Sequence, residues 1–191
     1  MPGHDEAMKA IQADAHKRMD HSVEIVKKEL GAVRTGRAHS EILAPVVVNY
    51  YGTTTPLHQL ATINVPESQL MVVTVFDRSQ VKEVEKAIQA AGLGLNPMAE
   101  GNVIRVPVPP LTEERRKEMV KRVHKLGEDG KVAIRNVRRE ANDKLVKMEK
   151  NKELSKDEHK MAQDKVQLET DNHIKAIDEL MQKKEKELMH V

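Results

Sequence analysis

Apolar and small residues recur at steps of three and four along three long segments, residues 5–34, 112–150 and 155–189. This spacing is typical of helices that carry one narrow apolar stripe, which a single helix cannot bury alone. The stripes consist of Met8, Ile11, Ala15, Met19, Val23, Val26, Leu30 and Val33, then Val120, Val123, Ile134, Val137, Ala141, Leu145 and Met148, and finally Ile174, Ile177, Met181 and Leu188. We therefore predict an antiparallel three-helix bundle, in which the short connection at residues 150–155 makes the last two helices antiparallel neighbours.

The ends and the interior of the two later helices carry further signals. Thr112 is placed to cap the second helix and Ser155 to cap the third, where Glu158 completes a capping box. Gly127 and Gly130 lie inside the second helix, and each costs up to about 1 kcal/mol relative to alanine. We predict that this turn is the weakest part of that helix.

The middle of the chain has a different pattern. Three β-branched runs at residues 46–52, 69–76 and 102–108 predict strands, and residues 79–92 between the last two predict a helix that ends at Gly92. The predicted fold is therefore α+β, with a bundle domain made of residues 1–35 and 111–191. A small, β-rich α/β domain, residues 36–110, is inserted between the first two bundle helices.

An inserted domain is joined to its host by two crossings of the chain, here near residues 34–39 and 105–111. The crossings contain Thr35, Gly36, Arg37, Pro107, Pro109 and Pro110. A two-stranded joint of this kind permits bending about one axis, so we predict a hinge. The alternative is that these are two ordinary linkers packed against each other.

Composition excludes several kinds of chemistry. The chain has no cysteine and only 2% aromatic residues, which argues against disulfides, thiolate chemistry and a base-stacking platform for single strands. We expect a cytoplasmic protein without a targeting segment or a membrane span.

The nine histidines are scattered, and His16 and His21 are five residues apart, so we expect surface or boundary roles and no metal site. The turn "GLGLNP" lacks the lysine of a phosphate-binding loop, and we expect no catalytic residue and no cofactor.

Positive charge is concentrated on the second long helix. Residues 111–150 hold 13 basic and 8 acidic side chains, whereas residues 151–191 hold 8 and 10. On a helix that advances about 100° per residue, Lys131, Arg138, Arg139 and Asn142 all lie within about 60° of Arg135. Such a face suits a track of backbone phosphates, because arginine offers a planar, bidentate fork. The alternatives are a solvated face, or ion pairs with the acidic third helix.

Long motifs in this order are similar to those of the ribosome recycling factor family. They are "VRTGRA" (33–38), "YYGTTTPLHQLATINVPE" (50–67), "VFDRS" (75–79), "EKAI…GLGLNP" (85–97), "IRVPVPPLTEERRKE" (104–118) and "IRNVRREANDK" (134–144). The resemblance implies the same bundle with an inserted domain, arranged as an L. It also implies a monomeric, non-enzymatic translation factor that binds the ribosome after termination. With elongation factor G, which hydrolyses GTP, such a factor splits the ribosome into subunits.

The resemblance also implies where RNA is bound. The main contact with large-subunit ribosomal RNA falls on Arg138, with Arg135 and Arg139 beside it. Arg34 and Arg37 lie at the joint and near RNA, and Arg115 and Arg116 start the second helix. The alternative function is a helical scaffold or chaperone-like protein, which holds protein partners on its helix surfaces. The two functions predict different salt dependence, because only an RNA-binding protein should lose affinity for its partner steeply as the salt concentration rises.

Overall fold

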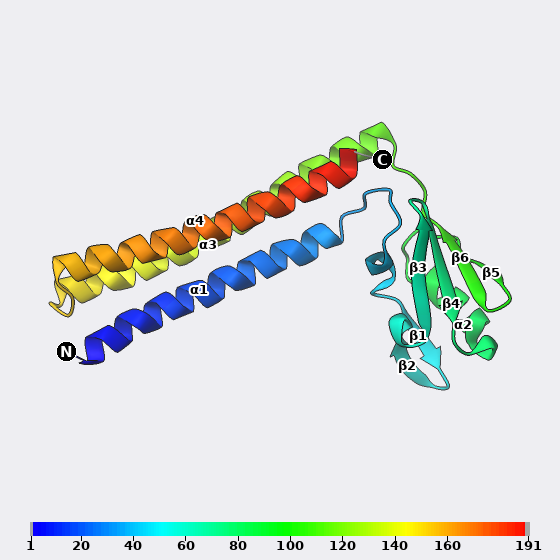
Figure 1. Ribbon diagram of the computed structural model, residues 1–191, viewed down its shortest axis with the longest axis horizontal. Coiled ribbons are helices and arrows are strands. Elements are labelled where there is room, and N and C mark those ends of the chain that lie inside the picture. The colour runs from blue at the N-terminus through cyan, green and yellow to red at the C-terminus, as the bar shows by residue number, and fades with distance from the viewer. Residues whose placement is uncertain (1, 190–191) are drawn as a thin grey trace. The chain divides into compact units, whose positions relative to one another are not determined.

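The computed structural model describes residues 2–189, which fold into two compact units (Figure 1). The helical unit comprises the chain up to Val33 together with Lys117–Met189, and the α/β unit comprises Arg34–Arg116. Within the described residues, no helix is long and apolar enough to cross a membrane. The α+β fold class predicted from the sequence is confirmed.

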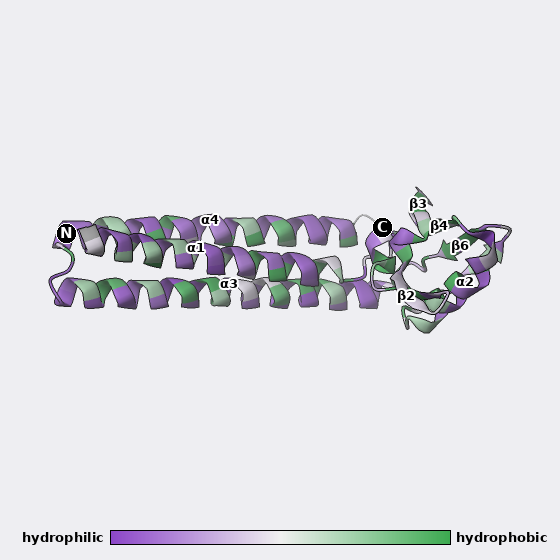
Figure 2. Ribbon diagram, turned by 90° about the horizontal axis from the view of Figure 1, so that it is seen from below, coloured by the Kyte–Doolittle hydropathy of each residue, from purple (hydrophilic) through white to green (hydrophobic). Residues whose placement is uncertain are grey.

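The helical unit is built from α1 (Pro2–Gly31), α3 (Glu113–Lys150) and α4 (Lys156–Met189). The three helices lie side by side, with α3 antiparallel to α1 and α4 (Figures 1 and 2). Each buries a narrow stripe that consists of Ala15, Met19, Val26 and Leu30 on α1, Val123, Ile134, Val137, Ala141, Leu145 and Met148 on α3, and Ala162, Val166, Ile177, Met181 and Leu188 on α4. Thr170 and His173 interrupt the α4 stripe with buried polar groups, whereas Ile174 is only half-buried.

The predicted helix starts are confirmed. The Arg115 amide donates to Oγ1 of Thr112 at 3.2 Å, and the Glu158 amide donates to Oγ of Ser155 at 3.1 Å. Each bond satisfies an amide that has no partner in the first turn of a helix. These caps fix where α3 and α4 begin.

That the two glycines of α3 mark a weak turn stays a prediction, and the structure adds a packing role for both of them. Gly127 and Gly130 are buried within a continuous helix. A β-carbon on Gly127 would lie 2.0 Å from Sδ of Met181 on α4, and one on Gly130 would lie 2.3 Å from Cγ2 of Val26 on α1. The absence of a side chain lets α3 approach both neighbours, so these positions are points of close packing.

The α/β unit holds two antiparallel sheets and α2 (Val81–Ala90). A hairpin of β1 (Val47–Tyr50) and β2 (Thr53–Pro56) forms the first sheet. The second sheet has the order β3–β4–β6–β5, with bounds Ala61–Glu67, Leu70–Val75, Val103–Pro107 and Met98–Glu100 respectively. Fifteen buried side chains, from Leu43 to Val108, form one apolar cluster in this unit.

The structure has three strands that the sequence pattern did not indicate, β2, β3 and β5. None of them shows strict alternation of buried and exposed residues: β5 is wholly exposed, and β3 buries only Ala61. The run at 46–52, predicted as one strand, turns at Tyr51 and Gly52, whose φ values of 47° and 83° belong to a tight hairpin. These strands are held by main-chain pairing more than by apolar burial, which explains their weak signal.

Candidate nucleic-acid interface

The candidate interface is the arginine face of α3, defined as Lys131, Arg135, Arg138, Arg139 and Asn142. Beside it, Ile134 is fully buried and Val137 and Ala141 are 5% exposed, so the apolar stripe fixes how α3 rotates in the bundle. Arg139 is exposed, and the other four side chains are half-buried at the edge of the stripe. The five residues therefore form one flank of the helix, as the sequence pattern predicts.

Lys131 differs from the arginines because α4 supplies it with a counter-charge. Its ammonium group pairs with Asp178 of α4 and lies 3.4 Å from Oε1 of Glu128. The hydrogen bond to Asp178 is the main cause that raises the pKa of Lys131 above its usual value. Ion pairing with the acidic third helix, one of the alternatives drawn from the sequence, therefore applies at this position.

Arg138 also points toward α4 but contacts a neutral group. Its Nη1 atom lies 3.4 Å from Oε1 of Gln167, whose amide in turn donates to Asp171 at 2.9 Å. Nη1 of Arg139 lies 3.5 Å from Oδ1 of Asn136 on the same helix. In the described part of the chain, Arg135, Arg138 and Arg139 form no ion pair with a carboxylate. Three guanidinium charges thus stand on this flank without compensation.

The acid nearest to these arginines in sequence faces the other neighbouring helix. Oε2 of Glu140 lies 2.5 Å from Nη1 of Arg18 on α1. This hydrogen bond is the main cause that lowers the pKa of Glu140. The carboxylate therefore remains charged but is engaged away from the arginine face.

Asn142 offers the face a donor more readily than an acceptor. Its Oδ1 atom is buried and has no hydrogen-bond partner among residues 2–189. Phosphate oxygens accept hydrogen bonds, so the amide nitrogen is the atom of Asn142 that suits an RNA backbone.

The arginines predicted near the joint have structural partners in the α/β unit. Nη2 of Arg34 donates to the carbonyl oxygen of Leu93 in the turn after α2, and Nη1 would lie 3.4 Å from a β-carbon on Gly94. Arg37 is half-buried, and its amide lies 3.4 Å from Oγ1 of Thr35. Arg34 therefore ties the first crossing to the "GLGLNP" turn, a role that the sequence did not reveal.

The two crossings also pack closely against each other. Gly36 has a φ of 75°, and a β-carbon there would lie 2.8 Å from the Leu111 amide nitrogen. Both the conformation and the contact require glycine. At the start of α3, Arg115 is exposed and Arg116 is half-buried, so Arg115 is the more accessible of the two.

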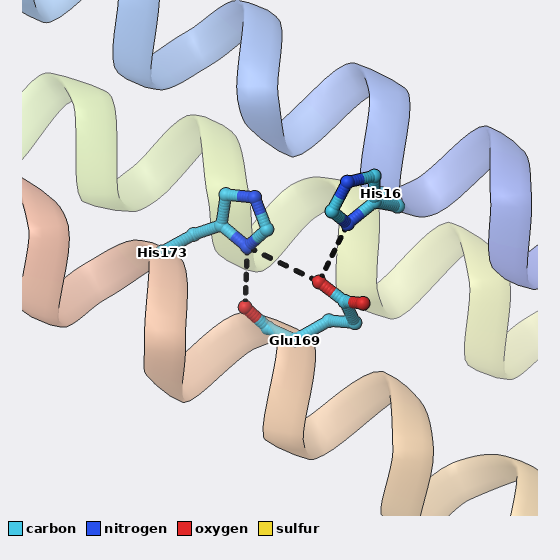
Figure 3. Close-up of side chains that lie close together, drawn as sticks. All are labelled: His16, Glu169 and His173. Atoms are coloured by element: carbon cyan, nitrogen blue, oxygen red, sulfur yellow. Dashed lines mark hydrogen bonds and ion pairs between the residues drawn. The ribbon is translucent and has the colours of Figure 1, made fainter.

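Two of the histidines that look scattered along the sequence belong to one cluster in the structure. His16 and His173 lie with their ring centroids 5.4 Å apart, and Glu169 lies between them (Figure 3). Asp20 lies 3.1 Å from His16 and 2.6 Å from His173. The available signal was a pair of four-residue spacings, His16 to Asp20 and Glu169 to His173, which places each pair on one face of a helix.

Comparison with known proteins agrees with this architecture. Residues 26–189 match the family model described as "Ribosome recycling factor". The ribosome-recycling factor of Staphylococcus haemolyticus (strain JCSC1435) is 51% identical over 184 residues, which cover 96% of this chain and all of the relative. That of Geobacillus kaustophilus (strain HTA426) is 50% identical over 183 residues, covering 96% of this chain and 99% of the relative.

Two solved structures are similar to this chain over almost its full length. A solution structure of a ribosome recycling factor shares 44% identity with a TM-score of 0.82, covering 96% of this chain and 98% of that one. The second is the T. thermophilus ribosome recycling factor, placed with E. coli elongation factor G on the E. coli post-termination complex. It shares 44% identity with a TM-score of 0.68 and covers 95% and 98% of the two chains.

Proposed function

The chain belongs to the ribosome recycling factor family, and we propose that it binds the post-termination ribosome and helps to split it into subunits. In this proposal elongation factor G is the partner and hydrolyses GTP, while the chain itself acts as a monomer without catalysis or cofactor. The similar T. thermophilus factor, which has been placed on a post-termination complex with elongation factor G, supports the choice of partner.

The observation that carries the proposal is the uncompensated charge of the arginine face. Arg135, Arg138 and Arg139 have no carboxylate partner among residues 2–189, although α4 is acidic and supplies one to Lys131. An arginine without a counter-charge retains its full attraction for a phosphate. We infer that these three side chains contact large-subunit ribosomal RNA, with Asn142 as an additional donor.

We rank Arg138 first among these contacts, because its side chain is held in position while its charge is not neutralised. The Gln167 amide orients the guanidinium at 3.4 Å and leaves its charge available. A side chain whose position is already restricted loses less entropy when it binds. We rank Lys131 below the arginines, because RNA would have to compete with Asp178 and Glu128 for its ammonium group.

Arg138→Ala tests this assignment. Losing one charge-assisted phosphate contact costs about 1–3 kcal/mol, so we expect roughly tenfold to hundredfold weaker binding to post-termination ribosomes. Arg122→Ala is a matched control, because Arg122 is an exposed arginine on α3 that lies about 140° around the helix from Arg135. The measurements are ribosome binding over a salt series, and subunit splitting with elongation factor G and GTP.

Three results would contradict the proposal in different ways. Normal splitting by Arg138→Ala would remove this residue from the interface. Equal losses in Arg138→Ala and Arg122→Ala would indicate that general positive charge matters and the arginine face does not. Binding that is insensitive to salt and needs no RNA would favour a helical scaffold protein instead.

The joint at residues 34–39 and 105–111 is the second part of the proposal, with domain limits at about residues 35 and 111. We propose that it bends as a hinge during recycling. The close contact of Gly36 with Leu111 supports a pivot, because it holds the two crossings together at one point. Distance measurements between labels in the two units, with and without the ribosome, test the hinge, and one unchanged distance in all conditions would exclude it.

A further inference from the structure

Two pairs of side chains face each other across α1 and α4 in the helical unit. His16 and Asp20 are four residues apart on α1, and Glu169 and His173 are four residues apart on α4 (Figure 3). Ligand atoms of His16, Glu169 and His173 all lie within 4.8 Å of one another. Pairs at this spacing project from one helix face, so the two helices bring these four side chains together.

The two nitrogens of each imidazole face different carboxylates. Nδ1 of His16 lies 2.8 Å and Nδ1 of His173 lies 3.5 Å from Oε2 of Glu169. On the other side, the Nε2 atoms of the same two rings lie 3.1 Å and 2.6 Å from the two oxygens of Asp20. The Glu169 carboxylate thus lies on the Nδ1 side of both rings, and the Asp20 carboxylate lies on the Nε2 side of both.

We propose that this cluster is a zinc-binding site in which Nδ1 of His16, Nδ1 of His173 and a carboxylate oxygen of Glu169 are the ligands. Two imidazoles and one carboxylate are a ligand set that suits Zn²⁺, whereas Mg²⁺ and Ca²⁺ prefer oxygen donors throughout. The fourth position of the ion is left for water. Zinc bonds of about 2.0 Å require ligand atoms about 3.3 Å apart in a tetrahedron, so small movements of these side chains are enough.

Asp20 has a separate, positioning role in this site. A histidine bound to a metal through one nitrogen usually donates its other N–H to a carboxylate, which fixes the tautomer and the ring orientation. Asp20 accepts from Nε2 of His173 and lies 3.1 Å from Nε2 of His16, so it can hold each ring in the tautomer whose Nδ1 carries the lone pair for the ion. Nδ1 of His173 lies 2.6 Å from the main-chain oxygen of Glu169, and binding of the ion replaces this contact.

The surroundings allow an ion to enter and make its binding consequential. The side chain of His16 is 52% exposed, whereas that of His173 is 8% exposed, so the site opens to solvent on the α1 side. An ion held by both helices would bridge α1 to α4 in the middle of a narrow stripe. Zinc should therefore raise the unfolding temperature of the helical unit.

The experiment is titration of the untagged, full-length protein with ZnCl₂ by calorimetry, together with thermal unfolding followed by circular dichroism. We expect one saturable site per chain. Asp20→Asn should weaken it by about 10- to 100-fold, as loss of a partner of a metal-bound histidine does. His16→Gln and Glu169→Gln, which remove a ligand from exposed or partly exposed positions, should weaken it further and abolish the thermal shift.

His21→Gln is the matched control, since His21 is an exposed histidine on the same helix and lies outside the cluster. It should bind zinc like the unmodified protein. Circular dichroism without metal establishes that each variant is folded. Absence of a saturable site in the unmodified protein would overturn the proposal, as would equal zinc affinity in His16→Gln and the unmodified protein. Either result would leave the cluster as a set of ion pairs that join two helices.

Discussion

The two units of this protein are held together in different ways. The α/β unit gathers fifteen buried side chains into one apolar cluster, to which α2 and both sheets contribute. The helical unit spreads its buried residues along narrow stripes on helices of 30, 38 and 34 residues, and interrupts them with glycines and the polar Thr170 and His173. One unit is stabilised by a compact core, and the other by close approach of helices along a line.

This difference explains where charge can accumulate. A narrow stripe covers only a small part of each helix, so most of α3 is free to carry charged residues without burying them. Arg135, Arg138 and Arg139 lie next to that stripe and take their positions from it. The α/β unit, with its compact core, has no long exposed face that runs beside a row of buried residues as it does on α3. The arginine face is therefore a consequence of the bundle architecture as much as of composition.

The largest effect that would test this comparison is a cavity in each core. Ile104→Ala in the α/β unit and Ile134→Ala in the helical unit both remove a side chain that is fully buried, and each should cost about 2–5 kcal/mol. The chain offers a separate probe for each unit. Both tyrosines, Tyr50 and Tyr51, lie in the α/β unit and there is no tryptophan, so fluorescence reports on that unit. Far-ultraviolet circular dichroism reports mainly on the long helices.

If the two cores are independent, each substitution should move one signal and leave the other nearly unchanged. Ile104→Ala should lower the fluorescence midpoint in urea, and Ile134→Ala the dichroism midpoint. Coincident shifts of both signals in either variant would show that the units unfold together, and the contrast drawn above would then not extend to stability.

A smaller effect distinguishes the two glycines of the α3 stripe. Alanine in place of glycine favours a helix by about 1 kcal/mol, but overpacking costs about 1–3 kcal/mol. At Gly130 the new methyl group would meet Val26, a stiff β-branched side chain, whereas at Gly127 it would meet the flexible end of Met181. We expect Gly130→Ala to lower the dichroism midpoint and Gly127→Ala to change it little. Equal destabilisation would show that both contacts are rigid.

The smallest effects concern one carboxylate in each unit. Asp77 accepts from the Ser79 hydroxyl at 2.6 Å, from the Ser79 amide and from Tyr51, and these hydrogen bonds, the hydroxyl's first, lower its pKa. The pKa of Glu140 is lowered by its hydrogen bond to Arg18. A carboxyl group whose pKa is lower in the folded state stabilises the protein above its ordinary pKa, and this contribution is lost as the pH falls through the folded value.

Stability at acid pH should therefore depend slightly on both groups, with different responses to salt. Asp77→Asn should reduce the acid sensitivity of the fluorescence transition below the ordinary value of 3.8, whatever the salt concentration, because its partners are uncharged. Glu140→Gln should reduce that of the dichroism transition below 4.5, and high salt should weaken this effect only in part, because the hydrogen bond to Arg18 is its first cause and the charge of Arg18 adds to it. An effect of Glu140→Gln that disappears in high salt would indicate that the charge outweighs the hydrogen bond.

Several features followed from sequence pattern alone because they are local. The steps of three and four identified all three long helices, and Thr112 and Ser155 marked the starts of two of them. The rotation of α3 followed as well, since the buried positions Ile134, Val137 and Ala141 determine which residues face away. The arginine face could thus be outlined without coordinates, although its contact with RNA stays a prediction.

Other features were hidden because they depend on residues far apart in the chain. Strands β3 and β5 bury little and exist because β4 and β6 pair with them. Gly127 and Gly130 look like helix breakers until Met181 and Val26 occupy the space beside them. Lys131 differs from the arginines because it forms an ion pair with Asp178, and no residue near Lys131 in the sequence indicates this ion pair. Each case requires knowing which side chain lies across the interface.

The sequence by itself determined the helices, the inserted α/β unit and a basic flank on α3, because propensity, periodicity and local charge act within a few turns of the chain. Only the tertiary structure decided which of the basic groups have a counter-charge, where α3 touches its neighbours, and that His16 and His173 share two carboxylates. Those outcomes arise where α1, α3 and α4 meet, and an ion pair or a ligand set is defined by distances between atoms and not by their separation in sequence.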